Sequence, residues 1–592
     1  MSSSIFFKSV TIFLFFVFGT TIHAKYLPHS HERSSSDLRY SVPLDQDNSI
    51  HLSWDLDFRK EKIIFRIRRP KLDPQSWFAF GMSGDGTLVN ADLVFWWKTK
   101  SGNLRLKDTW TDDTGIVHID GRQNVRVTGY SHDSTTEIIS LKRKFDNCDP
   151  EDYVIEDGTV DLIYVTADDR FSSLNGLNVS EYKNGLQRVQ LLKSQMPVPS
   201  FPDDVMILDV LAPSVEIPNS TTTYWCSTHR LPELTNKHHI IRFESIIPAE
   251  SQGIVHHMEV FLCEDDVTEM YNAPCQTESK PKPIESCKHV LGAWAMGAQP
   301  FSYPKEAGVP LGGDNFPKFV VLEVHYNNLE QKAGIIDHSG IRFYYTPTLR
   351  PQDAGIMELG LIYTPKMAIP PQNAGFLLNG FCTPECTNEG LPEDGIKVFA
   401  SQLHTHLTGV GVFTKHVRDG IELPTLNQDF HYSSHFQEIR LLKEQVTVLP
   451  GDLLITGCRY NTMDRSNVTL GGFGIKDEMC LNYIHYYPRT ELEVCKSSLS
   501  KRAVNRFFTY MYRNAGMPLV PGGGVALNYK LITWSRTISF ILQRVFRTGS
   551  IEMMCLDHSG SPLQGKWNEL RQPRITQPLL TRDPCRSLGD VI

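Results

Sequence analysis

Ile63-Ile-Phe-Arg-Ile-Arg68 is the stretch that decides the fold class, because apolar and basic side chains nearly alternate along it. Successive side chains of a β-strand point to opposite faces, so this alternation is typical of a strand with one buried face. Two further short runs, Ile50-His-Leu-Ser-Trp-Asp-Leu56 and Asp92-Leu-Val-Phe-Trp-Trp97, are set apart by Gly, Asp and Pro clusters. Together they predict a β-sandwich that closes near Asp161-Leu-Ile-Tyr-Val165.

Working outward, the same texture continues along the chain. A second β-rich stretch follows the proline-marked segment 196–202 and ends at a linker over 346–351, and a third begins near Gly355. One helix is predicted around Val504 to Asn514, and the rest of the chain to Ile592 is predicted to be loop-rich. Long amphipathic helical patterns are few. The sequence therefore predicts an all-β protein.

Composition excludes several classes of protein. Of the 592 residues, 41% are apolar and 21% are charged, and the net charge is −8. These values are those of an ordinary globular protein, and the length is enough for several domains. Basic residues are scattered and form no stripe, so nucleic acid is not expected as a partner.

The N-terminus indicates the secretory pathway. Lys8 precedes an apolar run from Val10 to Phe18, and Ala24 offers a small residue for cleavage, so residues 1–24 are predicted to be a signal peptide. An uncleaved signal that associates the chain with a membrane stays open, as does a homo-oligomer. Sequons that predict glycosylation begin at Asn178, Asn219 and Asn467. The 12 cysteines indicate up to six disulfides in an oxidising compartment, and the chain is expected to be secreted or lumenal (in the ER or a vesicle).

A first histidine cluster consists of His256-His257, in Gly253-Ile-Val-His256-His257-Met-Glu-Val-Phe, and His325, in Leu322-Glu-Val-His325. Adjacent side chains on a regular strand face opposite ways, so His256 and His257 could share one ion only through a bulge or through different ring nitrogens. His325 could supply a third nitrogen.

A second cluster consists of His404 and His406, in Gln402-Leu-His404-Thr-His406, with Met479 further along. Residues i and i+2 of a strand face the same side, so the two imidazoles can share an ion. Because a thioether favours Cu(I), adding Met479 makes the set suited to copper. Met479 as core filler is the competing interpretation.

Histidine and cysteine patterns such as these also have interpretations other than a copper site. With 21 histidines, pairs such as His238-His239 and His431/His435 arise by chance and are more often core or surface residues. Cys382 and Cys386 have the spacing of half a zinc site, but no second half accompanies them. A zinc hydrolase that uses the histidines is one rival function.

The quoted motifs, with Val324-His325-Tyr-Asn and Asp477-Glu-Met479-Cys-Leu-Asn-Tyr483, closely resemble the copper type II, ascorbate-dependent monooxygenases, a family that includes dopamine beta-hydroxylase and its monooxygenase-like relatives. The resemblance implies copper at two sites, with His256, His257 and His325 holding the electron-storage copper. It assigns His404, His406 and Met479 to the oxygen-binding copper, and it places Tyr224 and His404 among the catalytic residues. From chemistry alone, Tyr224 would be taken as a core residue.

The resemblance also divides the chain into domains. It implies a DOMON β-sandwich over residues 38–166, two jelly-roll-like copper domains over 200–345 and 355–510, and a loop-rich tail over 511–592. Some DOMON domains bind haem through Met and His, but Met82 has no convincing partner here, and packing is the favoured role. The implied disulfides pair Cys148 with Cys585, Cys226 with Cys275, Cys263 with Cys287, Cys382 with Cys495, Cys386 with Cys555, and Cys458 with Cys480.

The activity implied by the resemblance is hydroxylation of a C–H bond with O2, with ascorbate as the reductant. Peptidylglycine enzymes of the family carry an arginine two residues before the first histidine of the His-x-His pair, whereas this chain has Gln402. Loss of that permanent cation argues against a peptide carboxylate and for a small phenylethylamine-like substrate. A non-catalytic secreted copper-binding or scaffold protein with the same fold is the other rival.

Overall fold

The computed structural model describes residues 38–580, apart from positions 46, 72, 74, 75, 172, 268, 276–281, 329 and 475, together with Cys585. The predicted signal peptide, residues 1–24, lies outside the described residues. Two compact units make up the fold. Among the described residues, the first holds Pro202–Ala293 and Leu311–Thr348, and the second holds residues 38–201, Trp294–Pro310 and the residues from Leu349 onward. Over the described residues, no helix is long and apolar enough to cross a membrane.

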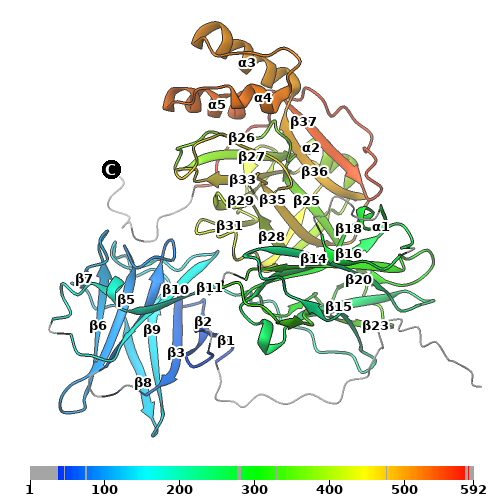
Figure 1. The fold of residues 1–592 in the computed structure, drawn as a ribbon. Coiled ribbons are helices and arrows are strands. Elements are labelled where there is room, and N and C mark those ends of the chain that lie inside the picture. The colour runs from blue at the N-terminus through cyan, green and yellow to red at the C-terminus, as the bar shows by residue number, and fades with distance from the viewer. Residues whose placement is uncertain are drawn as a thin grey trace, which may run out of the picture. The chain divides into compact units, whose positions relative to one another are not determined.

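The N-terminal part of the second unit is a β-sandwich, the front sandwich, drawn in blue and cyan in Figure 1. One sheet has the order β1–β2–β3–β9–β8, and the other has the order β11–β10–β4–β5–β6–β7. The bounds are β1 Tyr40–Pro43, β2 His51–Asp57, β3 Lys62–Pro70, β4 Trp77–Ser83, β5 Asp92–Lys98, β6 Leu104–Thr111, β7 Val117–Ile119, β8 Arg126–His132, β9 Thr136–Lys144, β10 Val160–Ala167 and β11 Lys183–Val189, with a short 3-10 turn at Val179–Glu181. The strands predicted from the alternating and apolar runs are thereby confirmed. The predicted end of the sandwich near residues 161–165 is wrong, because β11 pairs with β10 and extends the sheet to Val189.

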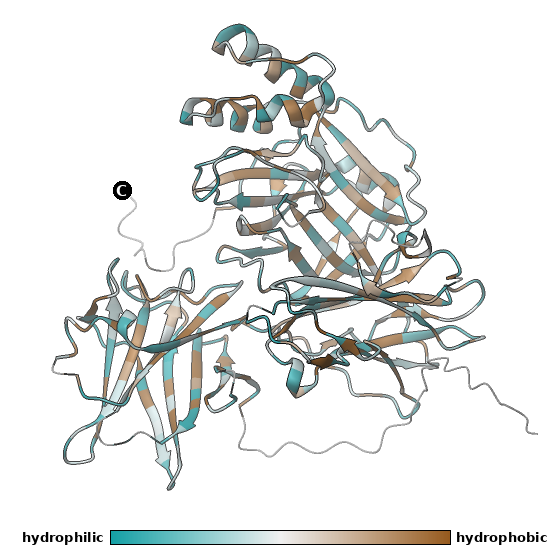
Figure 2. Ribbon diagram, in the orientation of Figure 1, coloured by the Kyte–Doolittle hydropathy of each residue, from teal (hydrophilic) through white to brown (hydrophobic). Residues whose placement is uncertain are grey.

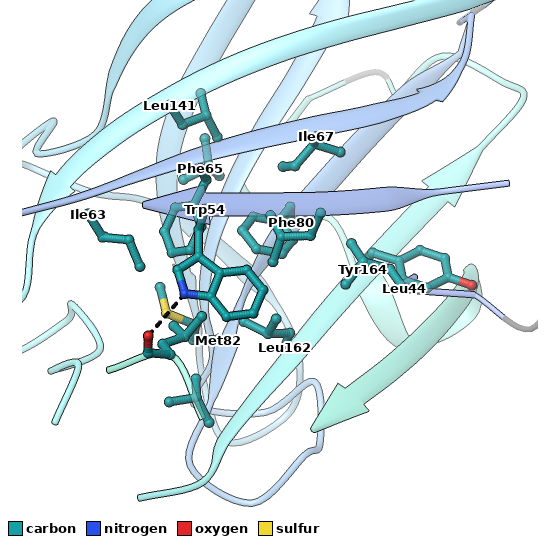
Figure 3. Close-up of a cluster of buried hydrophobic side chains, with 14 of the residues drawn as sticks. Leu44, Trp54, Ile63, Phe65, Ile67, Phe80, Met82, Leu141, Leu162 and Tyr164 are labelled. Carbon is teal, nitrogen blue, oxygen red and sulfur yellow. Dashed lines mark hydrogen bonds between the residues drawn. The ribbon is translucent and has the colours of Figure 1, made fainter. Parts of the chain in front are cut away.

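The core of this sandwich follows from that alternation. Ile63, Phe65 and Ile67 of β3 are buried, and the residues between them are only partly buried. Figure 3 shows these side chains gathered with Trp54 and Met82 between the sheets. The indole of Trp54 donates a hydrogen bond to the carbonyl of Leu191 at 3.0 Å. Met82 is 3% exposed within this apolar cluster, which fits the packing role that the sequence favours.

The first unit is also built of strands. One sheet pairs β12, β23 and β15, and a second has the order β17–β14–β21–β16–β18. The bounds are β12 Met206–Leu211, β13 Val215–Glu216, β14 Thr223–Arg230, β15 His238–Ile246, β16 Val255–Cys263, β17 Asn272–Pro274, β18 Cys287–Ala295, β21 Phe319–Tyr326, β22 Ile336–Asp337 and β23 Gly340–Thr346, with a 3-10 turn at Ala249–Ser251 and the short helix α1 at Lys282–Glu285.

A further sandwich follows in the second unit. Its two sheets have the orders β32–β28–β35–β25–β36–β37 and β27–β33–β29–β30, and β31 pairs with β29. The bounds are β25 Gly355–Leu361, β27 Phe376–Cys382, β28 Ile396–His404, β29 Gly409–Arg418, β30 Ile421–Glu422, β31 Asn427–Asp429, β32 Arg440–Val448, β33 Leu453–Tyr460, β35 Leu481–Tyr487, β36 Leu492–Leu499 and β37 Ile551–Asp557, with the helix α2 at Pro384–Gly390. The strands β26 Ala368–Ile369 and β34 Thr469–Leu470 pair with each other. Three short strands, β19 Phe301–Ser302, β20 Ala307–Leu311 and β24 Gln352–Asp353, lie outside these sheets. The all-β prediction is confirmed.

The C-terminal region contains more regular structure than the sequence predicts. Three helices, α3 Lys501–Ala515, α4 Gly524–Lys530 and α5 Arg536–Thr548, precede β37, whereas the sequence predicts one helix and then loops. Residues 537–542 of α5 are rich in β-branched and aromatic types, which by themselves favour a strand. Tertiary packing overrides that preference, because Ile538, Leu542 and Phe546 lie one helical turn apart and are all buried. Figure 2 shows both hydrophobic and hydrophilic residues along these helices.

Six disulfides cross-link the chain, and no free cysteine is found in the part that the structure describes. They join Cys148–Cys585, Cys226–Cys275, Cys263–Cys287, Cys382–Cys495, Cys386–Cys555 and Cys458–Cys480, the same pairs that the family resemblance implies. Because Cys382 and Cys386 are both bridged, their thiols are not available as zinc ligands.

Candidate metal centres

A bulge in β16 allows the adjacent residues His256 and His257 to face the same side of the strand. Val255 pairs with Tyr326 of β21, and the next pair along is His257 with His325, so β16 advances two residues while β21 advances one. His256 is the extra residue. A bulge re-aims a side chain that a regular strand would send to the opposite face. Of the two alternatives that the sequence leaves open, the structure therefore has the bulge.

The bulge brings three imidazoles together. The Nδ1 atom of His257 lies 3.2 Å from Nδ1 of His256 and 3.4 Å from Nδ1 of His325. Imidazole–metal bonds of roughly 2.0–2.1 Å separate two nitrogens on one ion by roughly 2.9–3.5 Å, depending on the bond angle. Both separations fall in that range. The geometry thus fits a metal held by three histidine nitrogens.

Tyr224 lies beside this cluster. It is paired with His325 across β14 and β21, and the two rings stack with centroids 4.3 Å apart and planes 1° apart. The hydroxyl of Thr222 is 3.1 Å from Nε2 of His325, so the hydrogen bond on that nitrogen orients the ring with Nδ1 toward the other histidines. Burial raises the pKa of Tyr224 to about 12, helped by the carboxyls of Glu323 and Glu259, and the phenol stays protonated.

The second histidine pair lies at the end of β28. His404 is the last residue of the strand and His406 follows two positions later, and the ring centroids are 5.3 Å apart with planes at 89°. Both side chains have a fixed partner on Nδ1. Nδ1 of His404 is 2.6 Å from the amide oxygen of Gln437, and Nδ1 of His406 is 3.0 Å from the carbonyl of Asp477.

These partners define which ring nitrogens can bind a metal. A carbonyl or amide oxygen only accepts hydrogen bonds, so each Nδ1 carries its hydrogen and each Nε2 keeps its lone pair. The second set would therefore bind through Nε2, whereas the first converges on Nδ1. Burial lowers the pKa of His404 to about 4, with a further contribution from His406, so the neutral form that binds metals prevails at neutral pH.

Met479 lies in the segment just before β35. In the pairing of β28 with β35, His404 is opposite Leu481, so Met479 comes two residues before the partner of His404. Its side chain is buried at 8% exposure. The hydroxyl of Tyr460 donates to its carbonyl at 2.5 Å, which fixes the backbone of this segment.

Two residues that support this site are not predicted from the sequence. The buried carboxylate of Glu478 accepts the backbone N–H of His406 at 2.9 Å and that of Met479 at 3.2 Å, so it ties two candidate ligands together. Glu478 is adjacent to Met479 in the quoted motif, and this adjacency could have indicated that it supports the site. Gln437 has no such signal, because it is 33 residues from His404 in the chain.

The comparisons with known proteins give the family. Dopamine beta-hydroxylase of Rattus norvegicus is 44% identical over 557 residues, which are 93% of this chain and 89% of that protein. The family model for the N-terminal domain of copper type II ascorbate-dependent monooxygenases matches residues 208–333, and the one for the C-terminal domain matches 352–508. This chain belongs to the copper type II ascorbate-dependent monooxygenases. It is accordingly an enzyme that uses copper, ascorbate and O2.

Other comparisons agree with this family. A DOMON model matches residues 46–167, the front sandwich. Dopamine beta-hydroxylase of Homo sapiens is 45% identical over 92% of this chain and 88% of its own length. Tyramine beta-hydroxylase of Caenorhabditis briggsae is 35% identical over 92% of this chain and 94% of its own length. The matched ranges of this monooxygenase contain both candidate ligand sets.

The histidine pairs set aside in the sequence lie elsewhere. His238 and His239 are buried in β15. Nδ1 of His431 is 2.8 Å from the carbonyl of Gly84, and the pKa of His435 is lowered by burial and by Arg188. A zinc hydrolase no longer fits a chain that belongs to the copper monooxygenases.

Proposed function

We propose that this monooxygenase hydroxylates a C–H bond of a small phenylethylamine-like amine and that its two copper ions are held by the two histidine sets. The observation that carries the proposal is the presence of two unlike ligand sets in one chain. One set has three nitrogens, and the other has two nitrogens and a thioether. The names of its relatives, which refer to dopamine and tyramine, support the substrate class.

In this proposal, His256, His257 and His325 would hold one copper, the site of electron storage. His404, His406 and Met479 would hold the other copper, the oxygen site, where the soft sulfur favours Cu(I). Copper supplies one-electron chemistry and O2 reduction, which amino-acid side chains cannot provide.

The protein's own groups then position and insulate the ligands. Gln437 and the carbonyl of Asp477 fix the ring orientation of His404 and His406. The protonated phenol of Tyr224 stacks on His325. His404 keeps its neutral form through burial.

The overall reaction balances as follows. The substrate C–H bond, one O2, two electrons and two protons give C–OH and water. Ascorbate supplies the two electrons and is oxidised, so no further reductant is needed.

Gln402 supports an amine rather than a peptide acid as substrate. It lies two residues before His404, and its amide donates to the carbonyl of Gln437 at 2.9 Å. A neutral amide cannot pair with a substrate carboxylate as an arginine does. We therefore expect dopamine and tyramine to be turned over and a glycine-extended peptide to be left unchanged.

The deciding experiment measures copper content and ascorbate-dependent O2 uptake with tyramine or dopamine as substrate. Two coppers per chain and hydroxylated product matched to O2 consumed are expected. Copper binding with no product from any phenylethylamine would instead favour a non-catalytic copper-binding protein. Turnover of a glycine-extended peptide would contradict the substrate class.

We further propose that the chain acts in the secretory pathway, in a lumenal or secreted form. The six disulfides support an oxidising compartment. Asn219 and Asn467 are exposed, as N-glycosylation would require, and Asn178 is half-buried. Membrane association through the signal and homo-oligomer formation remain proposals of the same kind.

A further inference from the structure

The loop between β31 and β32, residues 430–439, contacts the His404-x-His406 motif at two points. The hydroxyl of Tyr432 accepts the backbone N–H of Thr405 at 2.9 Å. Gln437 accepts from Nδ1 of His404 at 2.6 Å, and its own amide donates to the carbonyl of Ser434 at 2.7 Å. The position of the loop therefore determines the orientation of His404.

Both ends of this loop are fixed by the front DOMON sandwich. Asp429, at the end of β31, accepts the hydroxyl of Thr159 at 2.6 Å, and Arg440, at the start of β32, donates to that same hydroxyl at 2.8 Å. Arg440 and Asp429 also pair directly at 2.8 Å. A single DOMON hydroxyl thus completes a closed triangle that joins the two ends of the loop.

The triangle is buried and closely fitted. Asp429 is 0% exposed and Thr159 is 1% exposed, so these polar groups have little water to replace a lost partner. Gly158 approaches so closely that a Cβ there would lie 2.8 Å from Oδ1 of Asp429. The φ of Gly158 is +122°, a conformation that other residues rarely adopt. This contact therefore depends on glycine.

A second contact lies further along the loop. Lys193, which follows β11 in the DOMON sandwich, pairs with Glu438 at 3.4 Å, and Glu438 is itself 3.6 Å from Arg440. The hydroxyl of Ser194 donates to the carbonyl of Leu442 at 2.6 Å. Glu438, the residue after Gln437, is therefore also held by a contact with the DOMON sandwich.

The loop also has buried apolar side chains, because Tyr432 and Phe436 are 5% and 2% exposed. A cavity of about 570 Å³ borders the loop and is lined by, among others, Gly158, Leu403, Asp429, Gln437 and Arg440. The polar attachment to the DOMON sandwich therefore acts together with the burial of these two aromatic side chains in holding the loop.

We propose that the DOMON sandwich braces the oxygen-site histidine: Thr159, Asp429 and Arg440 are positioning residues that act through Gln437 on His404. This inference rests on the proposed role of His404 as a copper ligand. It gives the DOMON domain a function in this chain that requires no ligand of its own. Residues that orient a metal-binding histidine typically change metal affinity by about 10–100-fold when they are altered.

The test compares Thr159→Val with Thr109→Val in the full-length chain. Both threonines are buried in the DOMON sandwich, but the hydroxyl of Thr109 donates to the carbonyl of Leu93 within that domain. In the metal-free protein, hydrogen exchange over residues 430–439 is expected to accelerate in Thr159→Val only. Exchange in β28 and β35 is expected to stay unchanged in both variants.

Copper binding supplies the second readout. Competition with a Cu(I) chelator, with the Cu–S signal of X-ray absorption identifying the methionine-containing site, is expected to show about tenfold weaker binding in Thr159→Val. Gln437→Leu is expected to weaken that site at least as much, and Gln437→Glu, which keeps an acceptor, to restore most of the affinity. The three-histidine site is expected to be unchanged in all variants.

Wild-type loop exchange in Thr159→Val would overturn the brace, and wild-type copper affinity in Gln437→Leu would overturn its link to His404. A wild-type chain that binds no copper at the methionine-containing site would instead refute the proposed function. The exchange comparison in metal-free protein would still decide whether the brace exists.

Discussion

Met479 is a methionine whose two roles, core residue and copper ligand, predict different consequences of substitution. It is 8% exposed in the segment held by Glu478 and Tyr460. Isoleucine has a similar volume, so it can fill the space but lacks the thioether that favours Cu(I). Replacing Met479 by isoleucine therefore separates its proposed role as a copper ligand from its role in packing.

Met479→Ile is expected to abolish hydroxylation while the melting temperature stays close to that of the wild type. The measurements are product formation with tyramine and thermal unfolding of the metal-free protein. Met357→Ile is the matched control, because Met357 is buried at 1% exposure in β25 of the same sandwich. Near-normal turnover by Met479→Ile would remove Met479 from the ligand set.

Asp452 carries a pH dependence that can be worked out from its partners. Burial raises the pKa of its carboxyl, but hydrogen bonds from Arg418 and His416 outweigh burial and lower the pKa to about 2. An unfolded aspartate has a pKa of about 3.9, so the folded state gains stability above that pH and loses it as the pH falls toward 2. The contribution is about 2 kcal/mol.

Calorimetric unfolding between pH 5 and pH 2 should therefore show a drop in stability that is smaller in Asp452→Asn than in the wild type. The variant should also be less stable than the wild type at pH 7, because a neutral amide pairs less well with Arg418. Identical pH profiles for the two proteins would show that Asp452 does not carry this dependence.

At the scale of elements, α5 tests whether packing holds the C-terminal helices in place. Leu542 is 0% exposed in the core that the C-terminal helices share with the sandwich of β25 to β37. Truncation of such a residue typically costs about 2–5 kcal/mol, through lost burial and a cavity.

Leu542→Ala is thus expected to lower the free energy of unfolding by about 2–5 kcal/mol, measured by thermal unfolding. Phe540→Ala on the same helix is the control, because Phe540 is 68% exposed. Its effect should stay within about 0.5 kcal/mol. Equal effects of the two variants would mean that the buried face of α5 does not anchor it.

The bulge in β16 shows why one irregular element matters to the site. His257 pairs with His325 and could face it from a regular strand. Only the inserted position of His256 allows a third nitrogen to join them. The bulge consists of one extra residue, His256, and it raises the number of candidate ligands at this site from two to three.

At the scale of the whole molecule, each ligand set comes from a single compact unit. His256, His257 and His325 belong to the first unit, and His404, His406 and Met479 belong to the second. In the proposed function, each set would therefore load copper without the other. Hydroxylation needs two electrons and so, in the proposed function, both sets.

His325→Ala is expected to bind one copper per chain instead of two and to lose turnover. Elemental analysis gives the copper content, and X-ray absorption should show that the remaining copper keeps a sulfur ligand. His238→Ala, which changes a buried histidine of β15 in the same unit, serves as the control and should keep two coppers. Loss of both coppers from His325→Ala would contradict independent loading.

The sequence by itself determined the features that rest on local pattern. Alternating runs such as Ile63–Arg68 fix a strand because side-chain direction has a period of two, and the His-x-His spacing places two imidazoles on one side for the same reason. For the pair His256-His257 the sequence left two alternatives, a bulge or binding through different ring nitrogens, and the structure has the bulge. The pairing of the cysteines needed the family resemblance, because spacing alone leaves many pairings open.

Only the tertiary structure decided the features that depend on contacts between distant residues. The helix α5 forms although its residues favour a strand locally, because burial of Ile538, Leu542 and Phe546 outweighs local preference. Gln437 meets His404, and Thr159 meets Asp429 from 270 residues away, and neither contact leaves a local pattern. The chain's chemistry-bearing motifs are thus local, whereas the contacts that orient them are long-range and arise only when the chain packs.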